Sequence, residues 1–278
     1  MLVQQGHEVS HLGRTKKAGK TPSFVWDVDH GIMDEQALKD VDTVIHLAGA
    51  GVADQRWTEK RKKEILESRI KSTALLARYL EQNENVKTVV SASAIGYYGF
   101  GLGDAEFREE SKPGNDFLAQ VVKAWEGEVD KIQNKRVVKL RVGIVLSAKG
   151  GALKEMTTPI RWGVGAPLGT GKQYMSWIHF DDLCKMFVKA VEDTSMNGAY
   201  NATGPYAVTN HELTRTIAKT LHKPILLPSI PAFVLNLIVG EMAVIVVNGS
   251  IVSSKKIQQA GFKFQFPSLE EALPDLLG

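Results

Sequence analysis

The chain has 278 residues, 44% of them hydrophobic and 23% charged, which is typical of a globular protein that can bury a substantial core. The formal net charge is only +3, and the basic residues are dispersed apart from a run at 60–63, so the charge does not favour a nucleic-acid partner. The single cysteine, Cys184, excludes an internal disulfide and a thiolate zinc site, and the seven histidines form no cluster with metal-ligand spacing. We therefore expect a cytoplasmic protein that binds neither metal nor nucleic acid.

Neither a secretory signal nor a membrane span is expected. The first ten residues, MLVQQGHEVS, lack a long apolar segment. The most apolar stretch, 225–247, is interrupted by Pro228, Pro231, Gly240 and Glu241, so no run of about 20 apolar residues remains. We expect this stretch to form helices that face the core or a partner.

Short strands alternate with helices along the chain. The first residues read as the end of an apolar helix that stops at Gly6, followed by a strand at 8–12. After them we predict strands at 23–26, 43–47, 86–90, 137–146 and 262–266, and helices at 34–39, 59–80, 116–131 and 181–191, from 210 and from 268. This order implies βα units and a doubly wound parallel sheet. A strand normally precedes the first helix of such a sheet, and none is predicted here, so we expect a missing central strand and exposed sheet edges.

The stretch 86–99, VKTVVSASAIGYYG, is the first candidate for a site. Its β-branched start is typical of a strand buried on both faces, and its end is polar, with Ser91, Ser93, Tyr97 and Tyr98. Ligands of open parallel sheets bind just past the carboxyl ends of the strands. The sequence therefore indicates a binding site here, and the alternative is a polar loop that only caps a core strand.

Several stretches together resemble a known family. They are HLAGAGVADQRWTEKRKKEILESRIKST at 46–73, SASAIGYYG at 91–99, RVGIVLSAKGGAL at 141–153, SWIHFDDL at 176–183 and GAYNATGP at 198–205. In this order and spacing they are similar to the extended short-chain dehydrogenase/reductase superfamily, in the NAD-dependent epimerase/dehydratase-like group that carries a C-terminal domain of unknown function. The resemblance implies a Rossmann-like domain at 1–223 and an appended domain at 224–278.

The resemblance implies a catalytic Ser, Tyr and Lys. Ser93 and Lys123 fall where the family has its Ser and Lys, which orient the substrate oxygen and hold the nicotinamide ribose. The family's Tyr, the acid/base, should lie four residues before the Lys, but that position is Ala119, which cannot transfer a proton. Tyr97 or Tyr98 could reach the same space from the loop.

The family's phosphate-binding turn has no counterpart in this chain. Relatives open with a strand and a GxGxxG-type turn whose backbone N–H groups meet the cofactor pyrophosphate. This sequence starts inside the helix that should follow the turn, and Gly13 and Gly19 come only after the second strand. Either the start codon is misassigned or the truncation is natural, and for the chain as written we expect weakened pyrophosphate binding.

Other determinants of a nicotinamide cofactor are present. Arg14, with Lys16 and Lys17 nearby, stands where a basic residue accommodates the 2′-phosphate of NADP and an acidic one would bind the 2′-hydroxyl of NAD, so NADP is favoured. The resemblance also assigns six residues to the cofactor site: Ala48, Gly49, Ala50, Ser91, Val142 and Gly143. Arg69 stands where many relatives have an Asn that relays protons.

The substrate side is less specific. The resemblance places Arg56, Trp57, Gln173 and Trp177 in the cleft, where the indoles could stack on a ring and the amide could bind a sugar-like polyol. Each of these could equally be a core aromatic or a satisfied loop residue. His179 is expected to fix the start of the following helix rather than act as a base.

Three hypotheses remain at this stage. The first is an NADP-dependent epimerase, dehydratase or reductase that acts on a small hydroxylated or carbonyl substrate, with Ser93 and Lys123 in the site and a possible homodimer as its assembly. The second is a non-catalytic protein that senses NADP(H), which Ala119 favours. The third is that the chain as written binds no cofactor, because the phosphate turn is absent.

Overall fold

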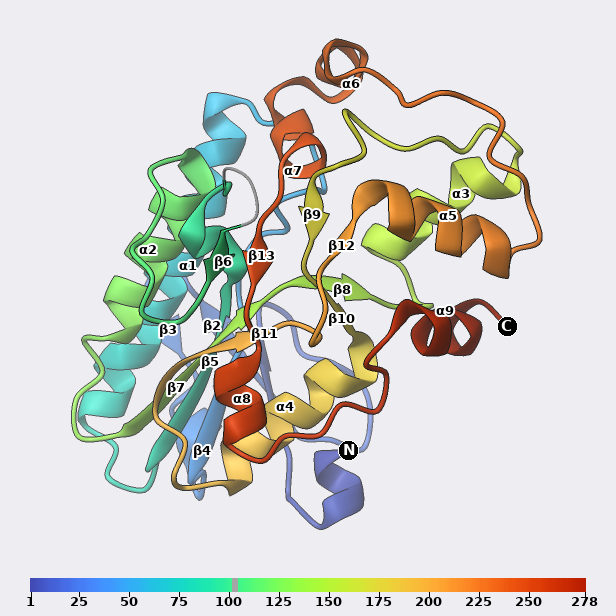
Figure 1. The fold of residues 1–278 in the computed structure, drawn as a ribbon. Helices are drawn as coiled ribbons and strands as arrows, with labels where there is room; N and C mark the ends of the chain where they lie inside the picture. Colours follow the sequence, from blue (N-terminus) through green and yellow to red (C-terminus); the bar gives the residue numbers. More distant parts are fainter. Residues whose placement is uncertain (102–104) are drawn as a thin grey trace.

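A computed structural model describes residues 1–101 and 105–278. Its main sheet is parallel and has four strands in the order β11–β7–β5–β4 (Figure 1). These are β4 (Thr43–His46), β5 (Thr88–Ala94), β7 (Arg136–Val142) and β11 (Gly198–Ala202). Helices α1 (Glu59–Glu81) and α2 (Phe117–Val129) cover one face, and α4 (Phe180–Glu192) and α8 (Lys255–Gln259) cover the other. The predicted doubly wound α/β fold is confirmed.

A second sheet of three short strands lies beside the first. In it β1 (His11–Gly13) pairs parallel with β2 (Ser23–Asp27), and β2 pairs antiparallel with β3 (Ile32–Met33). Among the described strands, β1 and β4 each have a partner on one side only. The two sheets meet through side chains, because the ring of Trp26 in β2 lies edge-on 6.2 Å from the ring of His46 in β4. Helix α1 then packs on both sheets in one core cluster.

The remaining elements complete the layers. They are the short 3-10 helices η1 (Leu2–Gln5), η2 (Glu35–Leu38), η3 (Ile95–Tyr98) and η4 (Gly240–Ala243), the strands β6 (Glu106–Phe107), β8 (Ile144–Leu146), β9 (Tyr174–Met175), β10 (Trp177–His179), β12 (Val208–Thr209) and β13 (Ile251–Val252), and the helices α3 (Ala152–Arg161), α5 (Asn210–Thr220), α6 (Ala232–Val239), α7 (Val244–Val247) and α9 (Leu269–Leu277). The predicted strand at 137–146 is thus divided at Gly143 into β7 and β8.

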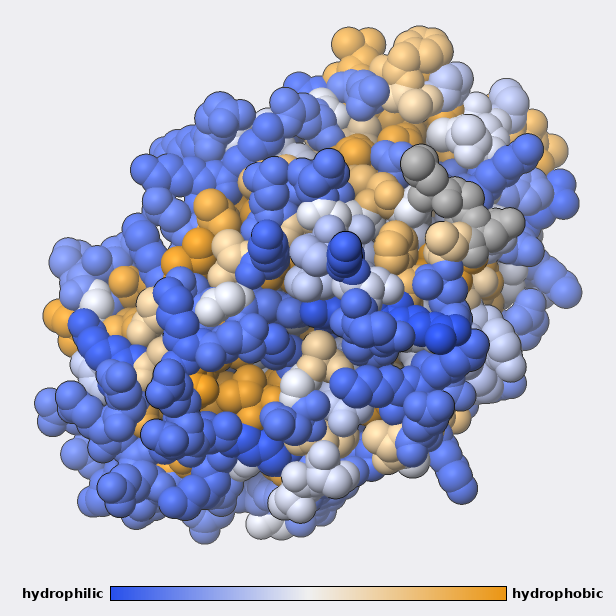
Figure 2. Space-filling view, turned by 60° about the vertical axis from the view of Figure 1, so that its left-hand side comes forward, coloured by the Kyte–Doolittle hydropathy of each residue, from blue (hydrophilic) through white to orange (hydrophobic). Residues whose placement is uncertain are grey.

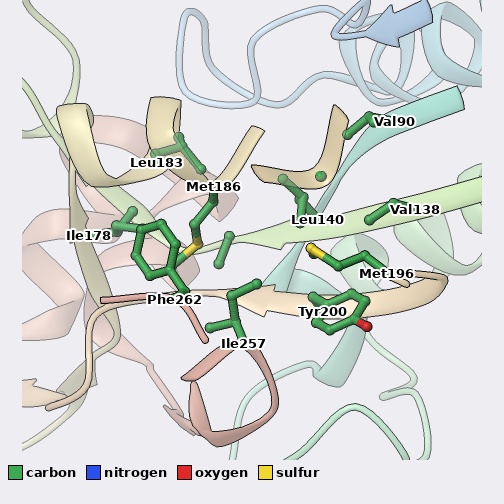
Figure 3. Packing of buried hydrophobic residues seen from close by; sticks show 12 residues of the cluster. Val90, Val138, Leu140, Ile178, Leu183, Met186, Met196, Tyr200, Ile257 and Phe262 are labelled. Carbon is green, nitrogen blue, oxygen red and sulfur yellow. The ribbon is translucent and has the colours of Figure 1, made fainter. Parts of the chain in front are cut away.

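The C-terminal residues share their cores with the rest of the chain. Ile257 and Phe262 pack with β5, β7 and α4 in the cluster that Figure 3 shows, and Leu269 and Leu273 of α9 pack with α3 and α5. Strand β13 pairs with β6, in the segment before α2. The residues after 223 therefore depend on the preceding ones for their burial, and a domain boundary at 223 stays a prediction.

The predicted strand at 262–266 is not formed. The amides of Gln265 and Phe266 donate to the two carboxylate oxygens of Asp182, at 2.9 Å each, instead of to a neighbouring strand. Asp182 is fully buried on α4, so this carboxylate holds the segment against the helix. Phe262 is buried against α4 and Phe266 against α5 and α9, so the alternating phenylalanines here reflect burial rather than membership of a sheet.

The apolar stretch at 225–247 forms α6, η4 and α7 at the top of the molecule. Figure 2 shows apolar side chains gathered there, at the height where Figure 1 places α6. Phe233, Leu237 and Ile238 are all exposed. The guanidinium of Arg56 donates to the carbonyl oxygens of Leu237 and Ile238 and so holds the end of α6. In the described part of the chain, no helix has both the length and the apolar character needed to cross a membrane.

Candidate active site

A row of polar residues crosses the carboxyl end of the main sheet. Strand register places Ser93 of β5 beside Arg141 of β7, and Arg141 beside Asn201 of β11. Paired residues of neighbouring strands point to the same face of a sheet. This row therefore faces α2, above the apolar part of the same face.

Glu126 of α2 meets this row from the helix side. The Ser93 hydroxyl donates to Glu126 Oε1 at 2.6 Å, and Arg141 donates through Nε and Nη2 to both carboxylate oxygens at 2.8 Å. All three side chains are buried. Burial alone raises the pKa of Glu126, but the hydrogen bonds and charge of Arg141 outweigh it, so this pKa is lowered. The result is a buried ion pair to which Ser93 is attached.

Tyr98 belongs to the same buried cluster. Its hydroxyl donates to Asn201 Oδ1 at 2.6 Å and accepts from Arg141 Nη1 at 2.9 Å. Burial raises the pKa of Tyr98 to about 12, and the nearby guanidinium of Arg141 only partly opposes this. The phenol stacks on Phe107 with ring centroids 5.3 Å apart. Tyr98 therefore stays protonated at neutral pH and serves as a structural hydrogen-bonding group.

Tyr97 occupies a different position. Its ring lies over the guanidinium of Arg141, with the ring centroid 3.6 Å from Cζ, and edge-on to Tyr98. Tyr97 is only partly buried, whereas Tyr98 is 3% exposed. A cation this close to an aromatic face fixes the orientation of the ring. Of the two predicted tyrosines, Tyr97 is thus the one whose side chain reaches solvent at the carboxyl edge.

Lys123 is not brought to this cluster. It lies on α2 between the buried residues Val122 and Trp125 but is itself exposed, whereas Ser93 is buried and bonded to Glu126. Ala119, which stands at the family's Tyr position, is fully buried. Glu126, one turn after Lys123 on α2, is the residue of this helix that bonds Ser93, and a shared role of Ser93 and Lys123 stays a prediction.

The predicted cofactor residues divide into accessible and buried ones. Ala48, Gly49 and Ala50, which follow β4, keep partial or full exposure, as do Val142 and Gly143. Arg14, which follows β1, is exposed. Ser91 is fully buried and donates to the carbonyl of Ala92, so the prediction that it contacts the cofactor is wrong.

Two of the residues predicted to bind a substrate, Trp177 and Gln173, make their contacts within the protein. Trp177 is 1% exposed and lies in a core cluster, so its prediction as a stacking platform is wrong. The Gln173 amide donates to Leu168 O and Val246 O, each at 2.8 Å, and so holds the 167–173 loop against α7.

The other two residues predicted to bind a substrate, Arg56 and Trp57, lie in the 48–58 loop. Arg56 holds the end of α6, and Trp57 Nε1 donates to Val52 O at 2.8 Å while its indole packs edge-on against Phe117. A role for either residue toward a substrate stays a prediction.

His179 is placed as expected. Its Nδ1 accepts from the amide of Asp181 at 3.1 Å at the start of α4, and its ring stacks on Phe266. This histidine thus caps the helix start, and the expectation that it does not act as a base stays a prediction. No group of three or more potential metal-ligating side chains occurs within 1–101 and 105–278.

Three residues of the cluster were not found from the sequence: Glu126, Arg141 and Asn201. A signal for Glu126 was available, because it falls in the buried stripe of α2 with Ala119, Val122 and Val129. A carboxylate in an apolar helical stripe needs a buried partner. Which partner it has depends on strand register, which the sequence does not state.

A parallel sheet with small residues after one strand and a polar cluster at its carboxyl edge is the architecture of Rossmann-like nucleotide-binding proteins. Comparison with known proteins gives the family. A model of the NAD dependent epimerase/dehydratase family matches residues 1–203, and a domain of unknown function (DUF1731) matches residues 230–276. The chain belongs to the NAD-dependent epimerase/dehydratase family.

Two relatives match the sequence of this chain over its full length. Epimerase family protein YfhF of Bacillus subtilis is 37% identical over 282 residues, which cover 100% of this chain and 92% of that protein. Epimerase family protein SDR39U1 of Mus musculus is 31% identical over 283 residues, which cover 100% of this chain and 94% of that protein.

A solved structure of the human SDR39U1 protein with NADPH has a TM-score of 0.89 and 30% identity, and the match covers 99% of this chain and 92% of that one. A Thermus thermophilus UDP-glucose 4-epimerase structure with NAD has a TM-score of 0.76 at 18% identity, over 99% of this chain and 92% of that chain, and so shares the fold.

Proposed function

We propose that this protein binds NADP(H) along the carboxyl edge of its main sheet and uses it in an oxidoreduction or epimerisation of a small hydroxylated or carbonyl compound. The observation that carries the proposal is the similarity over nearly the whole chain to a structure that contains NADPH. When bound, NADP(H) supplies or accepts the hydride. The residues of this chain bind the cofactor, orient the substrate and move the proton.

The residues after β4 fit a dinucleotide. Ala48, Gly49 and Ala50 carry minimal side chains, and a Cβ added at Gly49 would lie 3.1 Å from Cζ of Arg69. A backbone without side chains allows a nucleotide to approach closely. This geometry supports the assignment of the three residues to the cofactor.

The 2′-phosphate of NADP is assigned to Arg14. This arginine follows β1 directly and is exposed, as are Lys16 and Lys17 in the same loop. Basic side chains at this position suit the extra phosphate, whereas NAD binding needs an acidic residue there. The preference for NADP over NAD rests on this loop.

The proton is assigned to Tyr97. In the reductive direction, its hydroxyl would donate a proton to the carbonyl oxygen as the carbon gains a hydride. In the oxidative direction, the phenolate left by that donation would take the proton of the substrate hydroxyl as the carbon loses a hydride. Tyr97 is accessible and held by Arg141, whereas Tyr98 is buried with a raised pKa. Ser93 then acts as a positioning residue through Glu126 and Arg141.

Titration with NADPH, followed by nicotinamide fluorescence, tests binding. We expect saturable binding of NADPH that is tighter than binding of NADH, and we expect Arg14→Gln to remove this preference. Equal affinities of the unaltered protein for both cofactors would reject the assignment of Arg14. A protein that binds neither cofactor would reject the proposed function.

Turnover is tested with a panel of small carbonyl compounds, followed by nicotinamide absorbance. Tyr97→Phe is expected to keep NADPH affinity and to slow any turnover by roughly 100-fold or more, as loss of a general acid does. Tyr206→Phe, at a tyrosine that is 67% exposed, is the matched control.

A second candidate function is NADP(H) sensing without catalysis. The buried Ala119 at the family's Tyr position favours it. Tight NADPH binding without turnover of any compound in the panel would support the sensor and contradict the assignment of Tyr97.

A further inference from the structure

Arg69 of α1 lies against the loop that follows β4. Its Nη1 donates to the carbonyl oxygens of Ala50 at 3.0 Å and Ile65 at 2.9 Å. A Cβ added at Gly49 would lie 3.1 Å from its Cζ. The guanidinium also lies 5.1 Å from the ring centroid of Trp125, on α2. It is therefore held in place between α1, α2 and the proposed cofactor loop.

The charge of Arg69 is not neutralised by the protein. Among the described residues no carboxylate lies within ion-pair distance of it, and its Nε and Nη2 have no acceptor there. Arg61, two turns earlier on α1, is buried more deeply than Arg69 but is paired with Glu64 at 2.8 Å and Asp54 at 3.5 Å. Burial and the charge of Arg61 lower the pKa of Arg69.

A half-buried cation without a counter-ion is costly. The cost is recovered when an anion binds beside the cation. A guanidinium has five N–H donors in one plane, and this arrangement matches two oxygens of a phosphate. The two nitrogens of Arg69 that have no acceptor leave such a face available.

We propose that Arg69 binds the diphosphate of the nicotinamide dinucleotide beside Gly49 and Ala50. This inference rests on the proposed function. The position distinguishes the diphosphate from the 2′-phosphate, because Arg69 adjoins the loop after β4, whereas the basic loop of Arg14 follows β1. Arg69 would thus provide a side-chain anion-binding group beside the small residues that follow β4.

The test compares NADPH and NADH binding to the unaltered chain, Arg69→Gln and Lys71→Gln by nicotinamide fluorescence. Lys71 is the matched control, because it is an exposed cation on α1 that pairs with Glu67 at 2.9 Å. Both nucleotides contain the diphosphate, so Arg69→Gln is expected to weaken both by the same factor, at least about tenfold for lost charge-assisted hydrogen bonds. Lys71→Gln is expected to change neither affinity.

Two outcomes overturn this assignment while leaving the proposed function intact. One is unchanged affinity of Arg69→Gln for both nucleotides, which would indicate that the guanidinium binds a substrate anion or has a structural role. The other is loss of NADPH affinity alone, which would place the 2′-phosphate at Arg69. Failure of the unaltered chain to bind either nucleotide would overturn the proposed function together with this inference.

Arg69→Lys controls for folding, since it keeps the charge with fewer donors. We expect its affinity for both nucleotides to lie between those of the unaltered chain and Arg69→Gln. The rise in unfolding temperature on adding NADPH should follow the same order, because ligand stabilisation depends on affinity. Equal temperature rises in all three proteins would contradict the assignment.

Discussion

The hydroxyl of Ser93 and the carboxylate of Glu126 are joined by a 2.6 Å hydrogen bond that connects the end of β5 to α2. Arg141 also donates hydrogen bonds to Glu126, and its guanidinium lies against the ring of Tyr97. The family resemblance assigns Ser93 to the substrate, but here its hydroxyl is committed to an internal ion pair. The accessible end of this chain of contacts is Tyr97.

Breaking the ion pair is expected to destabilise the fold. Glu126→Gln leaves Arg141 buried without a counter-ion, and loss of one partner of a buried pair costs about 3–5 kcal/mol. Glu128→Gln is the matched control on the same helix, because it removes only an ion pair with the exposed Lys131, worth up to about 1 kcal/mol. Urea unfolding of both variants measures the difference. Equal losses would show that the Glu126–Arg141 pair contributes no more than a surface pair.

The two tryptophans Trp177 and Trp162 are expected to differ sharply. Trp177 is buried in a core cluster, so Trp177→Ala should cost about 3–5 kcal/mol of unfolding free energy. Trp162 is 81% exposed, and Trp162→Ala should stay within about 0.5 kcal/mol of the unaltered protein. Thermal or urea unfolding measures both. A stable Trp177→Ala protein that loses only ligand affinity would restore the substrate role expected from the resemblance.

The order of strands and helices could be predicted because their signals are local. The β-branched run before Ser91 became β5, and the predicted helices at 59–80, 116–131 and 181–191 became α1, α2 and α4 with ends shifted by two residues at most. Helix α3 was missed because it contains Pro159, and a proline normally marks a loop. Its stripe of Leu153, Thr157 and Ile160 is buried all the same, so tertiary packing outweighed the local signal.

The capping boxes show the same limit on a smaller scale. The Thr209 side chain and Glu212 form a reciprocal capping box at the start of α5. Ser268 begins a similar pattern, SLEE, but makes no side-chain cap at α9. The motif indicates that a side-chain cap can form, and the packing of the preceding segment decides whether it does.

The site was predicted only as far as one strand end could show it. Ser93, Tyr97 and Tyr98 do meet at the carboxyl edge, but they contact Glu126 and Arg141, which lie 33 and 48 positions after Ser93 in the chain. Strand register brings Arg141 beside Ser93, and the rotation of α2 turns Glu126 toward both. Neither register nor rotation follows from a motif.

Two glycines are expected to respond to alanine in opposite directions. A Cβ at Gly143 would lie 2.5 Å from Ser176 O and 2.8 Å from Thr203 Cγ2, so Gly143→Ala should destabilise the protein by about 1–3 kcal/mol. Gly127 lies in α2 with nothing within 4 Å of an added Cβ, so Gly127→Ala should stabilise by roughly 0.5–1 kcal/mol. Urea unfolding measures both. A neutral Gly143→Ala variant would show that the turn between β7 and β8 can relax.

Acid is expected to weaken the fold through His46. This histidine is buried on β4, bonded to Thr73 Oγ1, and burial lowers its pKa to about 4 from the ordinary 6.5. The unfolded chain therefore binds a proton before the folded one does, so stability is fully present above pH 6.5 and is lost as pH falls toward 4. Between pH 7.5 and 5 the loss should be about 2 kcal/mol, measured by urea unfolding, and smaller in His46→Gln. His30→Gln is the control, because its bond to Asp27 raises the pKa of His30 and its contribution has the opposite sign. If both variants lost stability as steeply as the unaltered protein, the acid sensitivity would not come from His46.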